Sequence, residues 1–176
     1  MSEDIVGGAG MPDGWQRLWA PHRMQYLTGE NRPLPGNSIE CPFCRIPTLS
    51  DEEGLIVYRG QEAYVVMNLY PYNAGHLLIC ANRHVADLTD LTDSERNEIF
   101  ELTSHAMKTL RKVSRASAFN LGMNQGAVSG AGVAEHIHQH VVPRWSGDAN
   151  FMPIIGQTKV LPQLLQETRA ALAAGW

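Results

Sequence analysis

The chain has 176 residues, of which 44% are hydrophobic and 18% charged, and its formal net charge is −4 at pH 7. These values predict one folded domain with a buried core. They argue against a general nucleic-acid-binding role, because no basic stripe is available to displace counterions. No apolar stretch approaches the length of a membrane span, and three cysteines are too few for a disulfide scaffold of this size, so we expect a cytoplasmic protein without a membrane partner.

The N-terminal region is predicted to consist of a tail and an arm. Residues 1–14 are acidic and rich in glycine, which is typical of a flexible tail and not of a signal peptide. We expect a single domain over residues 15–176. Its first segment is predicted to be an arm that ends in a loop at 29–37 and packs through aromatic side chains, namely Trp15, Trp19 and Tyr26.

Cys41 and Cys44 form a Cys-x-x-Cys motif. Two cysteines at this spacing can chelate a zinc ion or form a redox dithiol. A redox motif of the glutaredoxin kind needs a strand before it and a helix opening at it. Here residues 33–38 resemble a loop, and Pro47 would stop a helix early. We therefore favour zinc, and two buried thiols without a role are the weaker alternative.

Three strands are predicted next, over residues 53–59, 63–68 and 76–80, with a turn near Gly60-Gln61. Cys80 lies inside the apolar third strand and is interpreted as a small buried hydrophobic residue. His84 follows the end of this strand and is a further candidate metal ligand.

A long helix is predicted from Thr92 to about Lys112, because Thr92 and Glu95 fit a capping box. His105 on this helix is interpreted as solvated. The predicted packing stripe of the helix is Ile99, Leu102, Ala106, Leu110 and Val113. A second helix is predicted over residues 162–174, with a packing stripe of Leu164, Leu165, Thr168, Ala171 and Leu172.

A fourth strand over 118–124 is followed by a loop of small residues, 125–132, which leads into His136-Ile137-His138-Gln139-His140-Val141-Val142. The β character of this motif predicts a strand that Pro143 ends. Side chains alternate across a strand, so His136, His138 and His140 are expected on one face. A lone histidine is more often structural, but three on one face indicate a catalytic site or a metal site.

The loop and the histidines together predict phosphate chemistry. Successive backbone N–H groups in a tight loop can form an anion-binding nest, and glycine lets a phosphate approach the backbone closely. Neutral imidazole is nucleophilic near pH 7, so a histidine beside such a nest could attack phosphorus and form a phosphoramidate. A glycine-rich loop alone is a weak signal, and its place directly before the histidines strengthens it.

The histidine motif resembles the signature of the histidine triad (HIT) family of nucleotide hydrolases and transferases. Residues 120–132 and 147–151 extend the resemblance to the branch that includes actinobacterial diadenosine tetraphosphate phosphorylases, and so do residues 18–23 and 68–76. The resemblance implies an α+β fold: an antiparallel sheet of about five strands with a long helix and a C-terminal helix. It also implies a homodimer or a larger homo-oligomer.

The resemblance implies a role for each matching residue. His138 would be the nucleophile, and His140 would contact the phosphates and stabilise charge in the transition state. Asn68 would hold the ribose, and either Asn124 or Gln125 would contact the phosphates. Backbone N–H groups would come from three residues of the loop: Gly130, Ala131 and Gly132.

A structural zinc site is implied as well, and His136 would belong both to the triad and to this site. Its four ligands would be Cys41, Cys44, His84 and His136. His76 has a counterpart in the family and is interpreted as structural.

The implied reaction is nucleotidyl transfer from a dinucleoside polyphosphate to inorganic phosphate. A site lined by loop N–H groups and His140, with Arg144 at its edge, would attract phosphate over water. One alternative is a hydrolase of dinucleoside polyphosphates or nucleoside phosphoramidates. The others are a zinc-stabilised nucleotide-binding module without turnover, a thiol redox protein, and a catalytic metal centre of three histidines.

Overall fold

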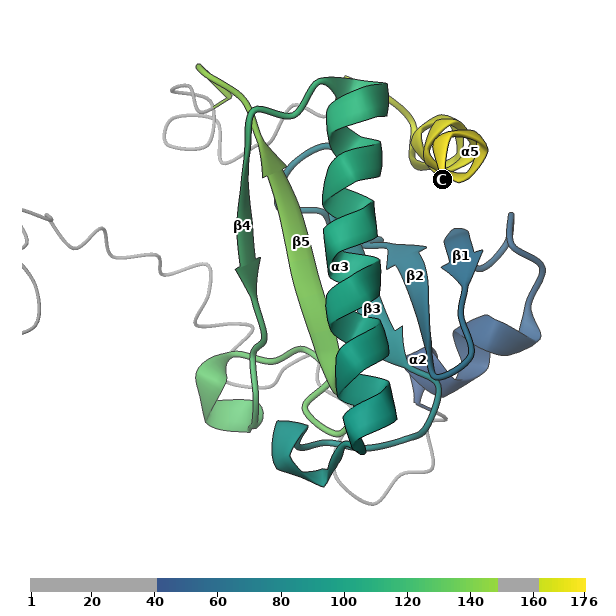
Figure 1. Cartoon of the computed structure of the whole chain (residues 1–176), viewed down its shortest axis with the longest axis vertical. Coiled ribbons are helices and arrows are strands. Elements are labelled where there is room, and N and C mark those ends of the chain that lie inside the picture. Colours follow the sequence, from purple (N-terminus) through teal and green to yellow (C-terminus); the bar gives the residue numbers. More distant parts are fainter. Residues whose placement is uncertain (1–40, 149–161) are drawn as a thin grey trace, which may run out of the picture. The chain divides into compact units, whose positions relative to one another are not determined.

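The computed structural model describes residues 41–148 and 162–176 (Figure 1). The chain divides into two units, Met1–Asn37 and Ser38–Trp176, and the described residues all belong to the second. The predicted tail at 1–14 and the arm with Trp15, Trp19 and Tyr26 lie outside the described residues. Within the described ranges, no helix is long and apolar enough to cross a membrane.

Five antiparallel strands form one sheet in the order β1-β2-β3-β5-β4. They are β1 (Ile56–Arg59), β2 (Ala63–Met67), β3 (Leu77–Ala81), β4 (Ala118–Gly122) and β5 (His138–Arg144). The central strands β2 and β3 are buried along their whole length, and β4 is an exposed edge strand. The predicted α+β architecture with five strands is confirmed.

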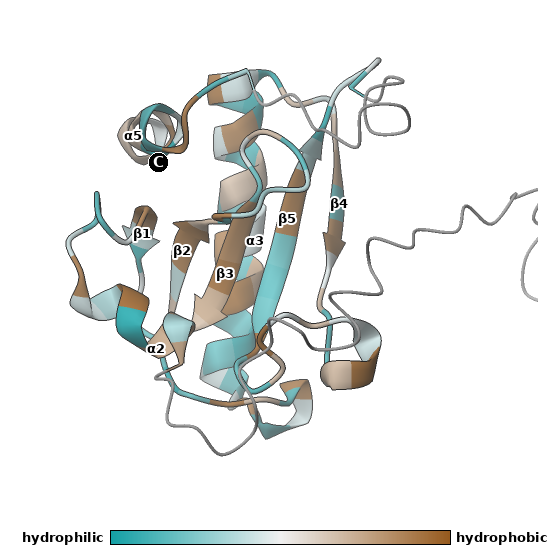
Figure 2. Ribbon diagram, turned by 180° about the vertical axis from the view of Figure 1, so that it is seen from behind, coloured by the Kyte–Doolittle hydropathy of each residue, from teal (hydrophilic) through white to brown (hydrophobic). Residues whose placement is uncertain are grey.

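Helices lie on both faces of this sheet. The long helix α3 (Asp93–Ser114) covers one face, and the short helix α2 (Pro42–Arg45) lies on the other (Figures 1 and 2). The C-terminal helix α5 (Leu165–Gly175) packs against α3 and β1. Figure 2 shows that β2 and β3 are hydrophobic, whereas the first half of β5 is hydrophilic. The remaining helical turns are η1 (Ile46–Thr48), η2 (Leu88–Asp90) and η3 (Ala127–Ser129).

The predicted capping box starts α3. The Thr92 side chain accepts a hydrogen bond from the Glu95 N–H at 3.2 Å, and the Glu95 carboxylate accepts one from the Thr92 N–H at 2.7 Å. The helix ends at Arg115, whose φ of +55° is left-handed. The predicted stripe is buried except for Val113, which lies in the last turn at the rim of the core and is exposed.

The predicted stripe of α5 is partly wrong. Leu172 is fully buried, and Leu165 and Thr168 are partly buried. Leu164 is exposed because it caps the helix in an extended conformation and does not share the helical face. Ala171 is exposed because its neighbour Leu172 occupies the side that faces the core.

Pro143 does not end the histidine strand, since β5 continues to Arg144. Pro143 pairs with Phe119 of β4, and its carbonyl accepts a hydrogen bond from the Asn73 side chain at 3.1 Å. The pairing of β5 with β3 ends at Val141, so the backbone of Pro143 lies beside the loop that precedes β3. No strand N–H is needed there, so proline is tolerated. The strand also begins later than predicted, at His138.

Glu98 of α3 stabilises the turn between β1 and β2 by hydrogen bonds. Its carboxylate accepts hydrogen bonds from the N–H groups of Gln61 and Ala63, at 2.9 and 3.0 Å, and from that of Glu62. A Cβ atom on Gly60 would lie 2.5 Å from Glu98 Oε1 and 2.6 Å from the Ala63 carbonyl oxygen. This close approach excludes any side chain at position 60.

We therefore predict that Gly60→Ala destabilises the protein by about 1–3 kcal/mol, because the new methyl group overlaps backbone and carboxylate atoms. Urea unfolding measures the change. Gly122→Ala is the matched control, since a Cβ atom there meets nothing within 4 Å. Equal stabilities of the two variants would contradict the assigned role of Gly60.

Candidate functional site

His138 and His140 form the centre of the site. Both lie on the face of β5 that is turned toward α2, opposite Cys80 and Leu78 of β3. Their ring centroids are 5.0 Å apart, and the residues are 6% and 9% exposed. Two neighbouring imidazoles are thus almost fully buried.

The hydrogen bonding of His138 determines which nitrogen is protonated. Its Nδ1 lies 2.8 Å from the carbonyl oxygen of His136, which can only accept, so Nδ1 carries the proton. Nε2 therefore keeps its lone pair. Burial lowers the pKa of His138, which favours the neutral ring. The Phe43 ring packs 4.7 Å from the His138 ring, between centroids. The result is a neutral, oriented imidazole whose Nε2 lone pair could act as a nucleophile.

His76 controls His140 in a similar way. The Tyr72 N–H donates to His76 Nδ1 at 3.0 Å, so the proton of His76 is on Nε2. This Nε2–H donates to His140 Nδ1 at 2.9 Å, which places the proton of His140 on Nε2. His140 is thus a hydrogen-bond donor at its outer edge. Burial, and to a lesser degree His138, lowers the pKa of His140 to about 4.

His76 is the residue that sequence reasoning undervalues. It is fully buried at the start of β3, and its partner His140 is 64 positions away in the chain. The local sequence holds no sign of this contact. The interpretation of His76 as merely structural therefore misses that His76 determines which ring nitrogen of His140 carries the proton.

Residues before the histidine strand approach the same site. The Asn124 amide nitrogen lies 3.5 Å from His140 Nε2, whereas the Gln125 side chain accepts a hydrogen bond from the Leu88 N–H at 3.1 Å. The structure thus brings Asn124, and not Gln125, to the histidines. The loop turns at Gly126 and Gly130 with left-handed φ values of +79° and +86°. Gly130, Ala131 and Gly132 follow η3 directly.

Asn68 follows β2 and lies beside His76. Its Oδ1 accepts a hydrogen bond from the Tyr70 N–H at 3.0 Å, and its amide nitrogen lies 3.2 Å from His76 Nδ1. The structure therefore groups the predicted ribose-binding residue with the histidine pair through His76.

Arg144, predicted at the edge of an anion site, forms an ion pair within the protein. Its guanidinium binds both carboxylate oxygens of Asp148, at 2.7 and 2.8 Å, and the side-chain oxygen of Asn120 at 2.9 Å. The pair neutralises the charge of Arg144 and lowers the pKa of Asp148 strongly. Arg144 thus ties the end of β5 to β4.

His136, the first histidine of the motif, has a different environment. Its Nδ1 atom lies 3.4 Å from Cys41 Sγ and 3.5 Å from Cys44 Sγ, and His84 Nδ1 lies 3.3 Å from Cys44 Sγ. The ligand atoms of Cys41, Cys44, His84 and His136 all lie within 4.8 Å of one another. Sulfur and nitrogen ligands on one tetrahedral zinc-sized ion are about 3.5 Å apart, so these residues could hold a metal ion.

Hydrogen bonds orient the ligands of this cluster. His136 Nε2–H donates to the Ala81 carbonyl at 2.8 Å, which leaves Nδ1 as the ligand atom facing the thiols. Arg83, beside His84, is held by both oxygens of the buried Glu95 at 2.8 and 2.9 Å. The donor set and its supports fit a closed structural site rather than an open catalytic one.

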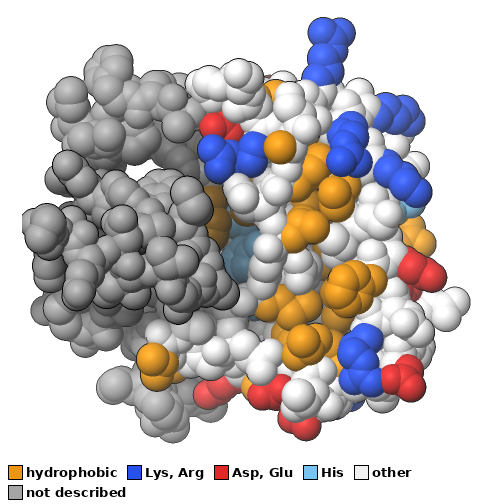
Figure 3. Space-filling model, turned by 60° about the vertical axis from the view of Figure 1, so that its left-hand side comes forward, with side chains coloured by type: hydrophobic (Ala, Val, Ile, Leu, Met, Phe, Trp, Pro, Cys, Tyr) orange, Lys and Arg blue, Asp and Glu red, His pale blue; other side chains and the backbone are white. Residues whose placement is uncertain are grey.

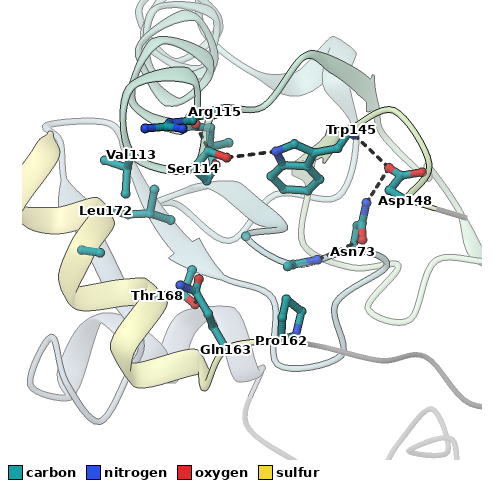
Figure 4. Close-up of a pocket in the computed structure, with 14 residues that line it drawn as sticks. Asn73, Val113, Ser114, Arg115, Trp145, Asp148, Pro162, Gln163, Thr168 and Leu172 are labelled. Atoms are coloured by element: carbon teal, nitrogen blue, oxygen red, sulfur yellow. Dashed lines mark hydrogen bonds between the residues drawn. The ribbon is translucent and has the colours of Figure 1, made fainter.

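A separate pocket of about 580 Å³ lies between the end of α3 and α5 (Figure 4). One wall is Trp145, whose Nε1 donates to the Ser114 carbonyl at 2.9 Å. Leu110 and Leu172 contribute apolar surface. None of the motif histidines lines it.

The HIT domain family matches residues 50–147 of the chain. The buried histidine pair of β5 therefore lies in a HIT fold, and the chain belongs to the HIT family. The chain is 51% identical over 172 residues to the AP-4-A phosphorylase of Mycobacterium tuberculosis, covering 96% of this chain and 88% of that protein.

More distant relatives match in sequence or in structure. The asymmetrical bis(5'-nucleosyl)-tetraphosphatase of Schizosaccharomyces pombe is 36% identical over 93 residues, covering 53% of this chain and 50% of that protein. A zinc-bound histidine triad family protein from Mycobacterium smegmatis is similar in structure, with a TM-score of 0.62 and 24% identity over 78% of this chain and 94% of that chain. This structural likeness shows the fold.

Proposed function

We propose that the protein is a diadenosine tetraphosphate phosphorylase that works through a nucleotidyl group on His138. The observation that carries this proposal is the hydrogen bond from His138 Nδ1–H to the His136 carbonyl, which leaves a neutral Nε2 at the site. The name of the M. tuberculosis relative supports the choice of substrate and acceptor.

The first step forms a P–N bond and breaks a P–O bond. His138 Nε2 attacks the α-phosphorus of diadenosine tetraphosphate in line, and ATP leaves with the electrons of the broken bond. In the second step an oxygen of inorganic phosphate attacks the same phosphorus. The P–N bond breaks, neutral His138 is restored, and ADP is released.

The other residues position the phosphates and stabilise charge. His140, protonated at Nε2 because of His76, donates a hydrogen bond to a phosphate oxygen, and Asn124 binds beside it. Backbone N–H groups of Ala131 and Gly132 contribute an anion nest, whereas the Gly130 N–H, also expected there, donates to the Ala127 carbonyl at 3.3 Å. Asn68 holds the ribose. Because the hydrogen bond from His76 fixes His140, little reorganisation of this donor accompanies the reaction.

The molecule that accepts the nucleotidyl group from His138, phosphate or water, distinguishes a phosphorylase from a hydrolase. We predict that diadenosine tetraphosphate and phosphate give ADP and ATP, with labelled phosphate in the β position of ADP. Nucleotide analysis by chromatography, with and without phosphate, measures this. AMP and ATP formed at the same rate without phosphate would make the protein a hydrolase, as the name of the S. pombe relative suggests for that protein. Binding without products would indicate a nucleotide-binding module.

We further predict that His138→Ala lowers kcat at least about 1,000-fold while nucleotide binding persists, since only the covalent route is lost. His140→Ala is the comparison and is expected to lose less. Steady-state kinetics and calorimetric titration measure the two effects. Turnover of His138→Ala within a few-fold of wild type would remove His138 from the mechanism.

We also propose that the metal held by the Cys-His cluster is structural zinc. Two thiols and two imidazoles match its ligand preferences, and the cluster fits tetrahedral spacing. Zinc would neutralise the thiolates and hold α2, with Phe43, against His138. It takes no part in the transfer steps above.

Purified protein is therefore predicted to contain one zinc per chain. Cys41→Ser is expected to lose the metal and to melt at a lower temperature, whereas Cys80→Ala is expected to keep the metal because buried Cys80 lies outside the cluster. Elemental analysis and thermal unfolding measure both. Zinc-free wild-type protein with freely titrating thiols, made in zinc-sufficient medium, would rule the site out.

We further propose that the protein forms a homodimer through β4 and α3. We also propose that it is located in the cytoplasm. Among the residues that the structure describes, no strand pairs with the outer side of β4, and Leu121 on it and Phe100 on α3 are exposed. Figure 3, which brings the β4 side forward, shows apolar side chains gathered there beside basic ones. A second copy would cover this area and pair the strand edge.

A further inference from the structure

The loop between β2 and β3 presents large apolar side chains beside the buried histidines. Leu69, Tyr70 and Tyr72 are 58%, 81% and 51% exposed, respectively. Exposed aromatic side chains gathered at one place indicate a contact surface for a ligand or partner. The catalytic roles assigned above leave these tyrosine rings without a function.

Tyr72 lies directly against the histidine pair. Its ring is nearly parallel to the His140 ring, with centroids 5.6 Å apart and planes at 16°, and it also packs on His76 at 4.8 Å. The ring therefore forms part of the site wall while about half of the residue is open to solvent.

The loop that carries Tyr72 is held in place by its own hydrogen bonds. Asn68 N–H donates to the His76 carbonyl at 2.9 Å, Tyr72 N–H to His76 Nδ1 at 3.0 Å, and His76 N–H to the Asn73 carbonyl at 3.2 Å. A ring fixed before a ligand arrives loses little entropy on binding. Tyr72 is thus a preorganised contact.

Four rings follow one another across the site. Phe43 packs on His138, His138 on His140, and His140 on Tyr72, with centroid distances of 4.7, 5.0 and 5.6 Å. Phosphates at the two histidines would place the rest of a nucleotide within reach of the aromatic residues on either side. Phe43 is buried, so Tyr72 offers the accessible aromatic surface.

We propose that Tyr72 is a specificity-determining residue that stacks on a purine base of the substrate while His138 and His140 bind the phosphates. This inference rests on the proposed function and deepens it. Base–aromatic stacking tolerates any purine, so the enzyme would favour nucleotides over inorganic polyphosphates of equal charge.

Two substrates with the same phosphates test the proposal: diadenosine tetraphosphate has two bases and adenosine 5'-tetraphosphate has one. Tyr72→Leu should lower kcat/KM for diadenosine tetraphosphate about 10-fold, mainly through KM, and Tyr72→Phe should restore it. If kcat/KM falls only for diadenosine tetraphosphate, Tyr72 stacks on the base of the departing nucleotide. If kcat/KM falls equally for both substrates, Tyr72 stacks on the base of the transferred nucleotidyl group. Tyr70→Leu is the matched control on the same loop and should lose less.

A binding measurement separates stacking from a purely structural role. In Tyr72→Trp, adenine nucleotides should quench the added indole fluorescence relative to wild type, and inorganic tripolyphosphate should not. Because this readout needs no turnover, it stands even if the acceptor assignment fails. Unchanged kcat/KM in Tyr72→Leu, failure of Tyr72→Phe to restore it, or equal quenching by tripolyphosphate would each overturn the proposal.

Discussion

The site depends on one hydrogen bond, from His138 Nδ1–H to the carbonyl of His136. It fixes the tautomer of His138 and leaves Nε2 able to act as a nucleophile. The carbonyl is itself held in place because His136 is anchored at Ala81 and faces two cysteines. The cysteine motif and the histidine motif therefore form one unit, in which the orientation of one histidine determines the chemistry of the next.

A second chain of hydrogen bonds makes Nε2 of His140 a hydrogen-bond donor, whereas Nε2 of His138 is an acceptor. Starting at the Tyr72 N–H and passing through His76, it places the proton of His140 on the outer nitrogen. Two histidines on adjacent positions of one strand face thus act as acceptor and donor. The difference arises from backbone groups of separate loops, because the imidazoles themselves are identical. Burial keeps both rings neutral near pH 7.

The sequence predicts most of the fold because its signals are local. The capping box of Thr92 and Glu95 spans four residues, and the helical and strand periodicities need only a short window. Pro143 leads to a wrong prediction of the strand end, because the strand accommodates this proline beside Asn73, which is 70 positions away. The end of a strand in the sheet is a tertiary property that the local sequence does not contain.

The site is predictable in its residue types and less so in their pairing. Cys41, Cys44, His84 and His136 are recognisable by spacing and resemblance, and the structure brings them together. The positions of Arg144 and His76 are not recognisable in this way. Arg144 carries a charge that suggests an anion site, but Asp148 neutralises it. His76 gains its role only when folding places it against His140.

The separation of the metal-ligand candidates along the chain bears on folding. Cys41 and His136 are 95 positions apart, and the segment between them contains β1, β2, β3, α3 and β4. Joining its ends costs loop entropy that grows only slowly with length, and the four candidate ligand atoms come within 4.8 Å of one another in the folded chain, so an ion bound to all of them would stabilise the folded state over the unfolded one. An ion bound there would select chains whose sheet is complete. Nucleophile orientation and completion of the fold would then be reached in a single event.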